Sequence, residues 1–95
     1  MLTFHRLVQR DADRALRRYE LVSDELRDSF WAEFLRVCNA VARNPGHYHF
    51  DTTGHRRANL RRFPYHLLYF EELKGVRVVA LRHHRQNPKF GIRRW

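Results

Sequence analysis

Residues 67–70, LLYF, and residues 78–81, VVAL, are apolar on both faces of the strands that they predict. Strands of this kind are typical of the middle of a sheet, where both faces are covered. The connection between them, EELKG at residues 71–75, is short and ends in glycine. The two strands are therefore predicted to pair as an antiparallel hairpin, which we expect to form the core.

Two amphipathic helices are predicted before this hairpin. Residues 9–21 and residues 23–43 carry apolar side chains at helical spacing, and Ser23 is a predicted N-cap for the second helix. The sequence NPG at residues 44–46 ends that helix, because proline cannot continue it. Helices with so short a connection are expected to fold back as an antiparallel hairpin and to cover one face of the sheet, leaving the other face open.

Two further strands complete the expected fold. Residues 2–7 alternate loosely and predict an edge strand, and residues 57–62 predict a strand with an apolar side and a basic side. Residues 47–55 are polar without a period, which is typical of a mobile loop. We therefore expect a single α+β domain over residues 1–95, with an N-terminal strand, the helical hairpin and a three-strand antiparallel meander in a mostly antiparallel sheet.

The charge of the chain is large and unevenly distributed. The net charge is +9, and Lys plus Arg against Asp plus Glu is 8 against 7 in residues 1–45 but 11 against 3 in residues 46–95. The half with the meander thus carries +8, which favours polyanionic or acidic partners. Of the 19 basic residues 17 are Arg, whose planar guanidinium suits bidentate contacts to phosphate.

Several classes of protein are excluded by the same composition. Cys38 is the only cysteine, so no disulfide framework is expected. No apolar run approaches the roughly 20 residues of a membrane span, and the first ten residues lack a signal-peptide layout. Histidines at 47, 49 and 55 lack a cysteine partner or a second cluster, so no metal or other cofactor is predicted. We expect a cytoplasmic protein that does not bind membranes.

The candidate chemistry lies where one central strand begins and the next ends. His66 opens the first, whereas His83, His84 and Arg85 follow the apolar part of the second, and antiparallel pairing brings these positions together. Only one of the two adjacent histidines can share a face with His66, because neighbours on a strand point oppositely. An imidazole can move a proton and a guanidinium can stabilise phosphate charge. The cluster could therefore cleave RNA, or simply bind phosphate.

Other basic and aromatic side chains could hold a nucleic acid. Arg61 and Arg62 are expected at the same end of the sheet as His66. Some of these groups have structural alternatives: His66 could be a strand histidine without a role, and Phe90 could pack the tail against the helices instead of stacking on bases. The predicted nucleic-acid-binding residues are Arg57, Arg61, Arg62, Arg82, Lys89, Phe90 and Arg93.

In its motifs the chain resembles the RelE/ParE superfamily of bacterial toxins from type II toxin–antitoxin modules. The motifs are NPG at residues 44–46, R-x-x-x-L-R-R-F-P-Y-H-L-L-Y-F at residues 56–70 and V-x-V-V-A-L-R-H-H-R-Q-N-P at residues 76–88. The resemblance implies a small basic toxin that a cognate antitoxin inhibits by wrapping an extended segment around it. The +8 charge of the second half predicts that this antitoxin is acidic.

The resemblance implies two different targets. RelE-like members cleave mRNA in the ribosomal A site with Arg or His side chains and a C-terminal tyrosine, whereas ParE-like members poison DNA gyrase and have no known nuclease action. His66 stands where RelE-like toxins usually have Arg, Arg85 matches their basic residue after the last strand, and Phe90, which has no hydroxyl, lies near the tyrosine position. We expect metal-independent, ribosome-dependent mRNA cleavage with His66, His83, His84 and Arg85 as catalytic residues. Gyrase poisoning and a non-toxic nucleic-acid-binding domain are the alternatives.

Overall fold

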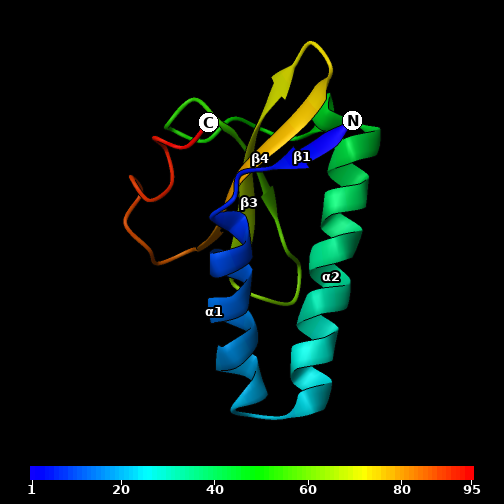
Figure 1. Ribbon diagram of the computed structural model, residues 1–95, viewed down its shortest axis with the longest axis vertical. Coiled ribbons are helices and arrows are strands. Elements are labelled where there is room, and N and C mark those ends of the chain that lie inside the picture. The colour runs from blue at the N-terminus through cyan, green and yellow to red at the C-terminus, as the bar shows by residue number, and fades with distance from the viewer.

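Two antiparallel helices pack on one face of a four-stranded sheet and extend beyond it (Figure 1). The structure is a computed structural model and describes residues 1–95. Its elements in chain order are β1 (Leu2–Phe4), α1 (Val8–Glu20), α2 (Asp24–Arg43), the 3-10 turn η1 (Pro45–His47), β2 (Arg56–Asn59), β3 (Tyr65–Glu72) and β4 (Gly75–His83). The expected order of strands and helices is confirmed.

The sheet has the strand order β1-β4-β3-β2, so the apolar strands β3 and β4 lie in its middle as predicted. The meander β2-β3-β4 is antiparallel, and β1 lies at the edge, parallel to β4. The β3–β4 register shifts by a bulge after Leu68. Gly75 opens β4 with φ +143, and a Cβ there would collide with the backbone of Met1. This close approach of β1 to β4 therefore requires glycine.

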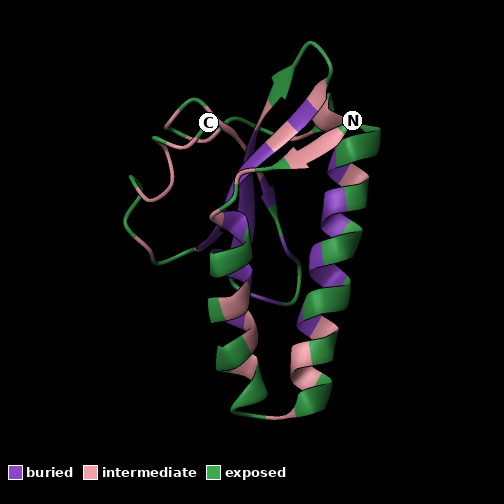
Figure 2. Ribbon diagram, viewed as in Figure 1, coloured by how far each residue is buried: buried purple, intermediate pink, exposed green.

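The main core lies between the helices and the sheet. Buried residues line the inner sides of both helices and the central strands (Figure 2). Ser23 caps α2 as predicted, since its Oγ accepts a hydrogen bond from the backbone N–H of Leu26 at 3.0 Å. An aromatic group with ring centroids 4.9–6.2 Å apart joins the two layers; its members are Tyr19, Phe30, Phe63 and Tyr65.

The second face of the sheet is covered by the C-terminal tail, residues 84–95, so the prediction of an open face was wrong. Leu68, Val79 and Ala80 form a small buried cluster against which Phe90 of the tail packs. Gly91 has φ +79, and a Cβ there would lie 2.7 Å from the Cβ of Ala80. The physical reason is that the central strands are apolar on both faces, so both faces need cover from water.

An ion pair ties the tail to α1 and to the outer edge of β4. The Arg94 guanidinium donates to the Asp11 carboxylate at 2.6 and 3.2 Å and to the Val79 carbonyl at 3.0 Å. Asp11, whose side chain is 1% exposed, also accepts the Leu81 N–H at 3.1 Å. Because β1 ends at Phe4, these backbone groups of β4 have no neighbouring strand, and the ion pair satisfies them instead.

Strand β2 is shorter than the predicted strand over residues 57–62. The buried carboxylate of Glu33 on α2 accepts the backbone N–H groups of both Arg61 and Arg62. These two N–H groups therefore bind a side chain rather than a neighbouring strand, and β2 ends at Asn59.

The Asp11–Arg94 ion pair yields the first prediction. Replacing Arg94 by Gln should lower the free energy of unfolding by about 3 kcal/mol, because it leaves the buried carboxylate without its cation. Urea unfolding measures the loss. The neighbouring exposed Arg93→Gln is the matched control and should change the free energy by less than about 0.5 kcal/mol. Equal effects of the two substitutions would show that the ion pair does not hold the tail.

Candidate functional site

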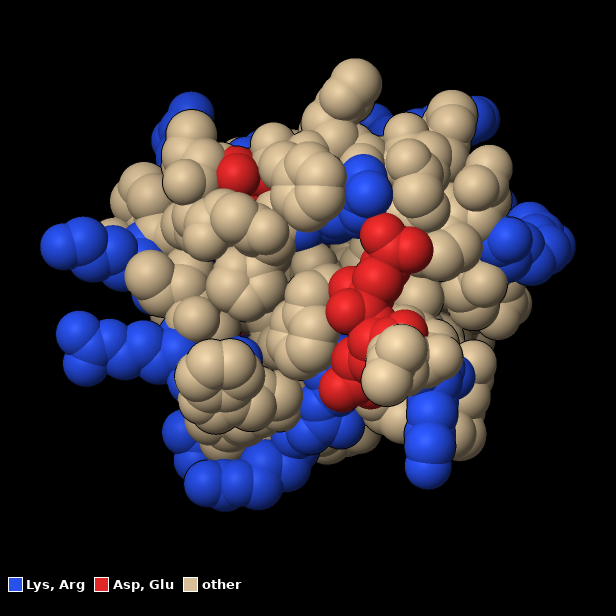
Figure 3. Space-filling view, turned by 90° about the horizontal axis from the view of Figure 1, so that it is seen from above, with Lys and Arg blue, Asp and Glu red and all other residues tan.

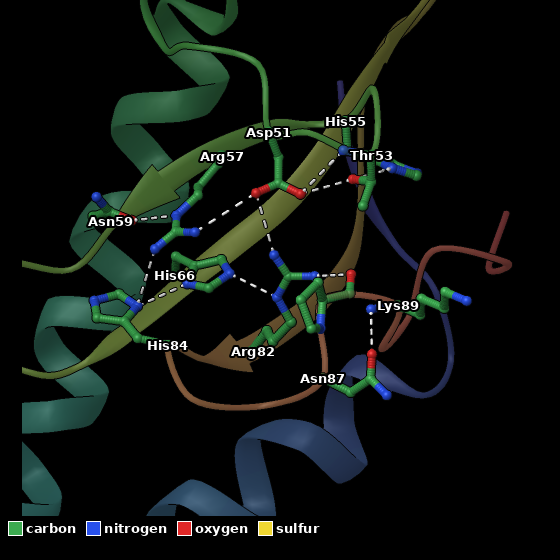
Figure 4. A network of polar contacts seen from close by, with 11 residues as sticks. Asp51, Thr53, His55, Arg57, Asn59, His66, Arg82, His84, Asn87 and Lys89 are labelled. Carbon is green, nitrogen blue, oxygen red and sulfur yellow. Dashed lines mark hydrogen bonds and ion pairs between the residues drawn. The ribbon is translucent and has the colours of Figure 1, made fainter.

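A chain of hydrogen-bonded side chains lies on the sheet face opposite the helices, where β3 begins and β4 ends (Figure 4). His66 and Arg82 are direct cross-strand partners, and Asn59 is the partner of His66 on the other side. Arg57, two residues before Asn59, shares the same face. The predicted meeting of β3 and β4 at this end is therefore confirmed, with contributions from β2.

Arg82 is the buried centre of this chain, with only 3% of its surface exposed. Its Nε donates to Nε2 of His66 at 2.8 Å, Nη1 to the Pro88 carbonyl at 2.6 Å and Nη2 to Oδ1 of Asp51 at 3.3 Å. All three nitrogens of the guanidinium are thus engaged inside the molecule. Arg82 is consequently not free to bind phosphate as predicted, because burial commits it to these partners.

The protonation of the two stacked histidines follows from their neighbours. Because Arg82 always donates, Nε2 of His66 must be the acceptor, and its proton lies on Nδ1, 2.9 Å from Nδ1 of His84. Nδ1 of His84 also faces Nη2 of Arg57 at 3.3 Å. This nitrogen therefore accepts from two donors, and the proton of neutral His84 lies on its Nε2.

Both imidazoles are held neutral. Burial lowers the pKa of His66 to about 3, with help from the positive charges of Arg57 and Arg82. His66 is completely buried, whereas His84 is exposed. Burial, Arg57 and His83 also lower the pKa of His84. His66 therefore cannot touch a substrate and acts at most by positioning His84, which corrects its prediction as a catalytic residue.

His83 points to the helix side of the sheet, so only one of the adjacent histidines joins His66, as predicted. Its ring packs against Tyr65 with centroids 4.9 Å apart, and its Nδ1 accepts the backbone N–H of Arg85 at 3.0 Å. Burial lowers the pKa of His83, and Arg18 and Arg85 lower it further. His83 and Arg85 line a cavity of about 700 Å³ between α1 and the end of β4, separate from the His66 chain.

The remaining predicted residues do not gather at His66. Arg61 and Arg62 are exposed beside α2, in a hollow that includes Glu33, because their backbone N–H groups bind the Glu33 carboxylate. Because they follow Asn59, the cross-strand partner of His66, they lie at the same end of the sheet as His66, as predicted, but on the side of α2. Arg57 alone among the arginines predicted to bind nucleic acid is next to an exposed histidine.

The predicted residues Lys89, Phe90 and Arg93 of the tail do not join the chain of hydrogen bonds with their side chains, although the Pro88 carbonyl does. Lys89 and Arg93 are exposed. Phe90 packs on Leu68, Val79 and Ala80, and the Arg94 guanidinium lies 4.9 Å from its ring centroid. Phe90 therefore packs the tail on the sheet and not, as one reading of the sequence had it, on the helices. This packing also removes its ring from stacking on bases.

Asp51 is the member of the site that the sequence analysis missed. Its side chain is 8% exposed and forms ion pairs with Arg82 at 3.3 Å and Arg57 at 3.6 Å. Burial alone would raise its pKa, but hydrogen bonds from Thr53 and the charge of Arg82 lower it overall. The Asp51 side chain thus connects the loop of residues 47–55 to β2 and β4. The sequence contains one signal that could have identified Asp51: it is the only acidic residue between Glu33 and Glu71.

Positively charged side chains surround the hairpin end of the molecule, which is the end of the sheet away from His66 and His84 (Figure 3). Seen from the end that carries the β3–β4 hairpin, Lys and Arg side chains project around the rim, while most acidic atoms gather in one patch (Figure 3). No group of three or more His, Cys, Asp or Glu side chains is arranged to hold a metal ion. None of the helices is long and apolar enough to cross a membrane.

A comparison with protein-family models matches residues 2–88 to the ParE toxin of type II toxin–antitoxin systems, parDE. The chain belongs to the ParE toxin family. The resemblance inferred from the sequence motifs is thereby confirmed, and family membership makes the protein the toxin of a type II toxin–antitoxin pair, with an antitoxin as its partner. None of the curated proteins compared with this ParE-family toxin matches it significantly.

The buried histidine yields a pH-dependent prediction. The unfolded chain binds a proton at His66 near pH 6.5, whereas the folded toxin does not until about pH 3, so the unfolded state holds more protons in between. The free energy of unfolding should therefore be greatest above pH 6.5 and fall as the pH is lowered from 7.5 to 5. Each such histidine contributes up to about 1.4 kcal/mol per pH unit.

Urea unfolding of His66→Gln tests this assignment. Glutamine keeps a donor and an acceptor but does not titrate. The number of protons taken up on unfolding, which sets the slope of the free energy of unfolding against pH, should therefore fall by up to one. His49→Gln, at an exposed position, is the matched control. An unchanged slope in His66→Gln would contradict a neutral buried imidazole.

Proposed function

We propose that this toxin arrests growth as a ParE-type poison of DNA gyrase, by binding its target rather than by cutting RNA. The match to the ParE family over residues 2–88 supports the proposal, since ParE-like toxins poison gyrase. The observation that carries it is the state of the three candidate histidines. None of them presents a free basic nitrogen.

A general base needs an unprotonated nitrogen within about 2.6–3.2 Å of the proton that it removes. Both ring nitrogens of His66 are engaged, at 2.8 and 2.9 Å. In His84 and His83 the accepting nitrogen is Nδ1, occupied by His66 and Arg57 in the first and by the Arg85 backbone in the second. The nitrogen left free in each neutral ring carries a proton, so these histidines donate hydrogen bonds and do not abstract protons.

The same geometry suits recognition of an anionic group. The Arg57 guanidinium lies 3.3 Å from Nδ1 of His84 and is held in place by Asn59 at 2.9 Å and by Asp51, whereas the free Nε2–H of His84 lies on the other side of the ring (Figure 4). Each is an oriented donor at the edge of a rigid sheet and can bind an oxygen of a carboxylate or a phosphate without reorganisation. On a toxin, Arg57 and His84 together form a contact surface for its target.

Ribosome-dependent mRNA cleavage of the RelE type is the second candidate. It is favoured by one observation, the exposed His84 imidazole supported from behind by His66, Arg82 and Asp51 and flanked by Arg57. To act as a base, His84 would have to lose its Nε2 proton and carry one on Nδ1 instead. That change would disrupt the bonds from both His66 and Arg57, which makes the base role the less favourable one.

Two assays on the full-length toxin separate these functions. Induced without its antitoxin, the toxin should leave abundant transcripts intact in primer extension, and the purified toxin should inhibit plasmid supercoiling by purified gyrase. New 5′ ends at defined codon positions, lost when translation is blocked, with gyrase unaffected, would instead establish the RelE-type activity. Harmless overexpression would leave only a non-toxic nucleic-acid-binding domain.

Variants of the contact surface sharpen the test. The double variant Arg57→Gln/His84→Gln should weaken gyrase inhibition by about tenfold or more, because it removes the oriented donors of the surface, of which the charged one is worth about 1.5–3 kcal/mol. The matched control is Arg43→Gln/His49→Gln, which changes two exposed residues outside the surface. Full inhibition by the first variant would remove this surface from the proposal.

We further propose that the antitoxin is acidic where it meets the sheet half of the toxin. The +8 charge of residues 46–95 supports this, because complementary charges favour association. The dissociation constant of the toxin–antitoxin complex should therefore rise as salt is increased from 50 to about 500 mM, since exposed charge pairs are screened. Isothermal titration at several salt concentrations measures the effect, and a constant affinity would contradict an acidic interface.

A further inference from the structure

Arginines form a continuous row along the outer side of α1. The row, called here the α1 arginine track, begins in the turn before the helix and continues with residues spaced three or four apart, which places them on one face. From Arg10 to Arg18 it covers about two helical turns, or about 12 Å. Its members are Arg6, Arg10, Arg14, Arg17 and Arg18.

The charges of this track are not neutralised within the chain. None of its five arginines forms an ion pair, and the only hydrogen bond from their side chains is a long one, 3.4 Å, from Arg18 to the Tyr65 hydroxyl. Of the nearby acids, Asp11 is bound to Arg94, and Asp13 accepts a hydrogen bond from Gln9. Glu20, the other surface acid of α1, is paired with Arg27, so the five guanidinium groups have no ion-pair partner and are left to attract an external anion.

The track borders two hollows rather than a flat surface. The cavity of about 700 Å³ at the end of β4 and a second one of about 530 Å³ share Arg14 and Arg17. The first adds Arg85 and His83 on its far side, and the second is bordered by Arg6 and Arg10. The two adjoining hollows along one row of arginines, together called here the groove, accommodate an extended polyanion better than a single small anion, which could reach only one or two of these arginines.

We propose that the α1 arginine track, with Arg85, binds the phosphodiester backbone of a nucleic acid. Repeated phosphates match repeated guanidinium groups, which form bidentate bonds to them. Nucleic-acid interfaces are polar and strongly positive, whereas the core of a protein interface is apolar and poor in charge. The second hollow has one apolar residue among seven, so an acidic protein lacks an apolar anchor there. The proposal is compatible with a toxin that acts on gyrase and with one that acts on the ribosome, because both targets bind nucleic acid.

Fluorescence anisotropy of the full-length toxin tests this site, with a labelled 20-base-pair DNA duplex in one arm and a labelled RNA hairpin in the other. Each is titrated at several salt concentrations between 50 and 200 mM. The triple variant Arg14→Gln/Arg17→Gln/Arg18→Gln should bind at least about tenfold more weakly. Its slope of log K against log salt should be shallower by about 2 to 3, since each lost phosphate contact contributes about 0.9 for duplex DNA.

Two further variants keep the result interpretable. Arg36→Gln/Arg43→Gln/Lys74→Gln removes the same charge from exposed positions outside the track and should keep most of the affinity and the slope. Arg14→Lys/Arg17→Lys/Arg18→Lys retains the charge and should keep the slope. Circular dichroism checks that each variant is folded, which is expected because Gln and Lys are good helix formers.

Each outcome supports or overturns the site. Loss of binding confined to the track variant supports it, and a preference for the duplex or the hairpin then identifies DNA or RNA as the source of the phosphates. Equal loss in the two glutamine variants would overturn it, because only net charge would matter. Competition by polyglutamate as strong as by nucleic acid of the same charge would also overturn it and assign the groove to an acidic protein.

Discussion

The buried guanidinium of Arg82 holds together the half of the molecule that carries the candidate site. A cation with 3% exposure is stable only with an anion and full hydrogen bonding. It obtains these from three separate segments: Asp51 in the loop before β2, His66 in β3 and the Pro88 carbonyl in the tail. Together with β4, which carries Arg82, four chain segments are thus fixed relative to one another by one side chain. His84 is positioned in turn by its contact with His66.

A second buried ion pair, Asp11–Arg94, does the same for the other edge of the sheet. It joins α1, β4 and the end of the tail, and it takes the place of strand pairing where β1 stops. The two ion pairs together hold the tail across the second face of the sheet. Two of the basic surfaces that remain accessible lie on different sides of the molecule, one at His84 and Arg57 and one along α1.

Much of the fold was predictable because it depends on local patterns. The caps and apolar stripes of the helices and the doubly apolar strands at 67–70 and 78–81 each act over a few residues, so their order could be deduced. The site was predictable only in part. Antiparallel pairing placed His66 beside the end of β4, and strand alternation separated His83 from His84. The partners of Arg82 and the place of Asp51 were not predictable, because they come from contacts between residues up to 31 positions apart.

The sequence by itself determined that this is a small, basic α+β protein with a central apolar hairpin and the motifs of the RelE/ParE toxins. Only the tertiary structure decided which of its many arginines and histidines are structural and which are available. The physical reason is that burial and hydrogen bonding, not residue type, decide this. Arg82 and His66 are enclosed and mutually satisfied, whereas Arg57 is held by neighbouring side chains but remains a third exposed, and His84 and the arginines of α1 are exposed.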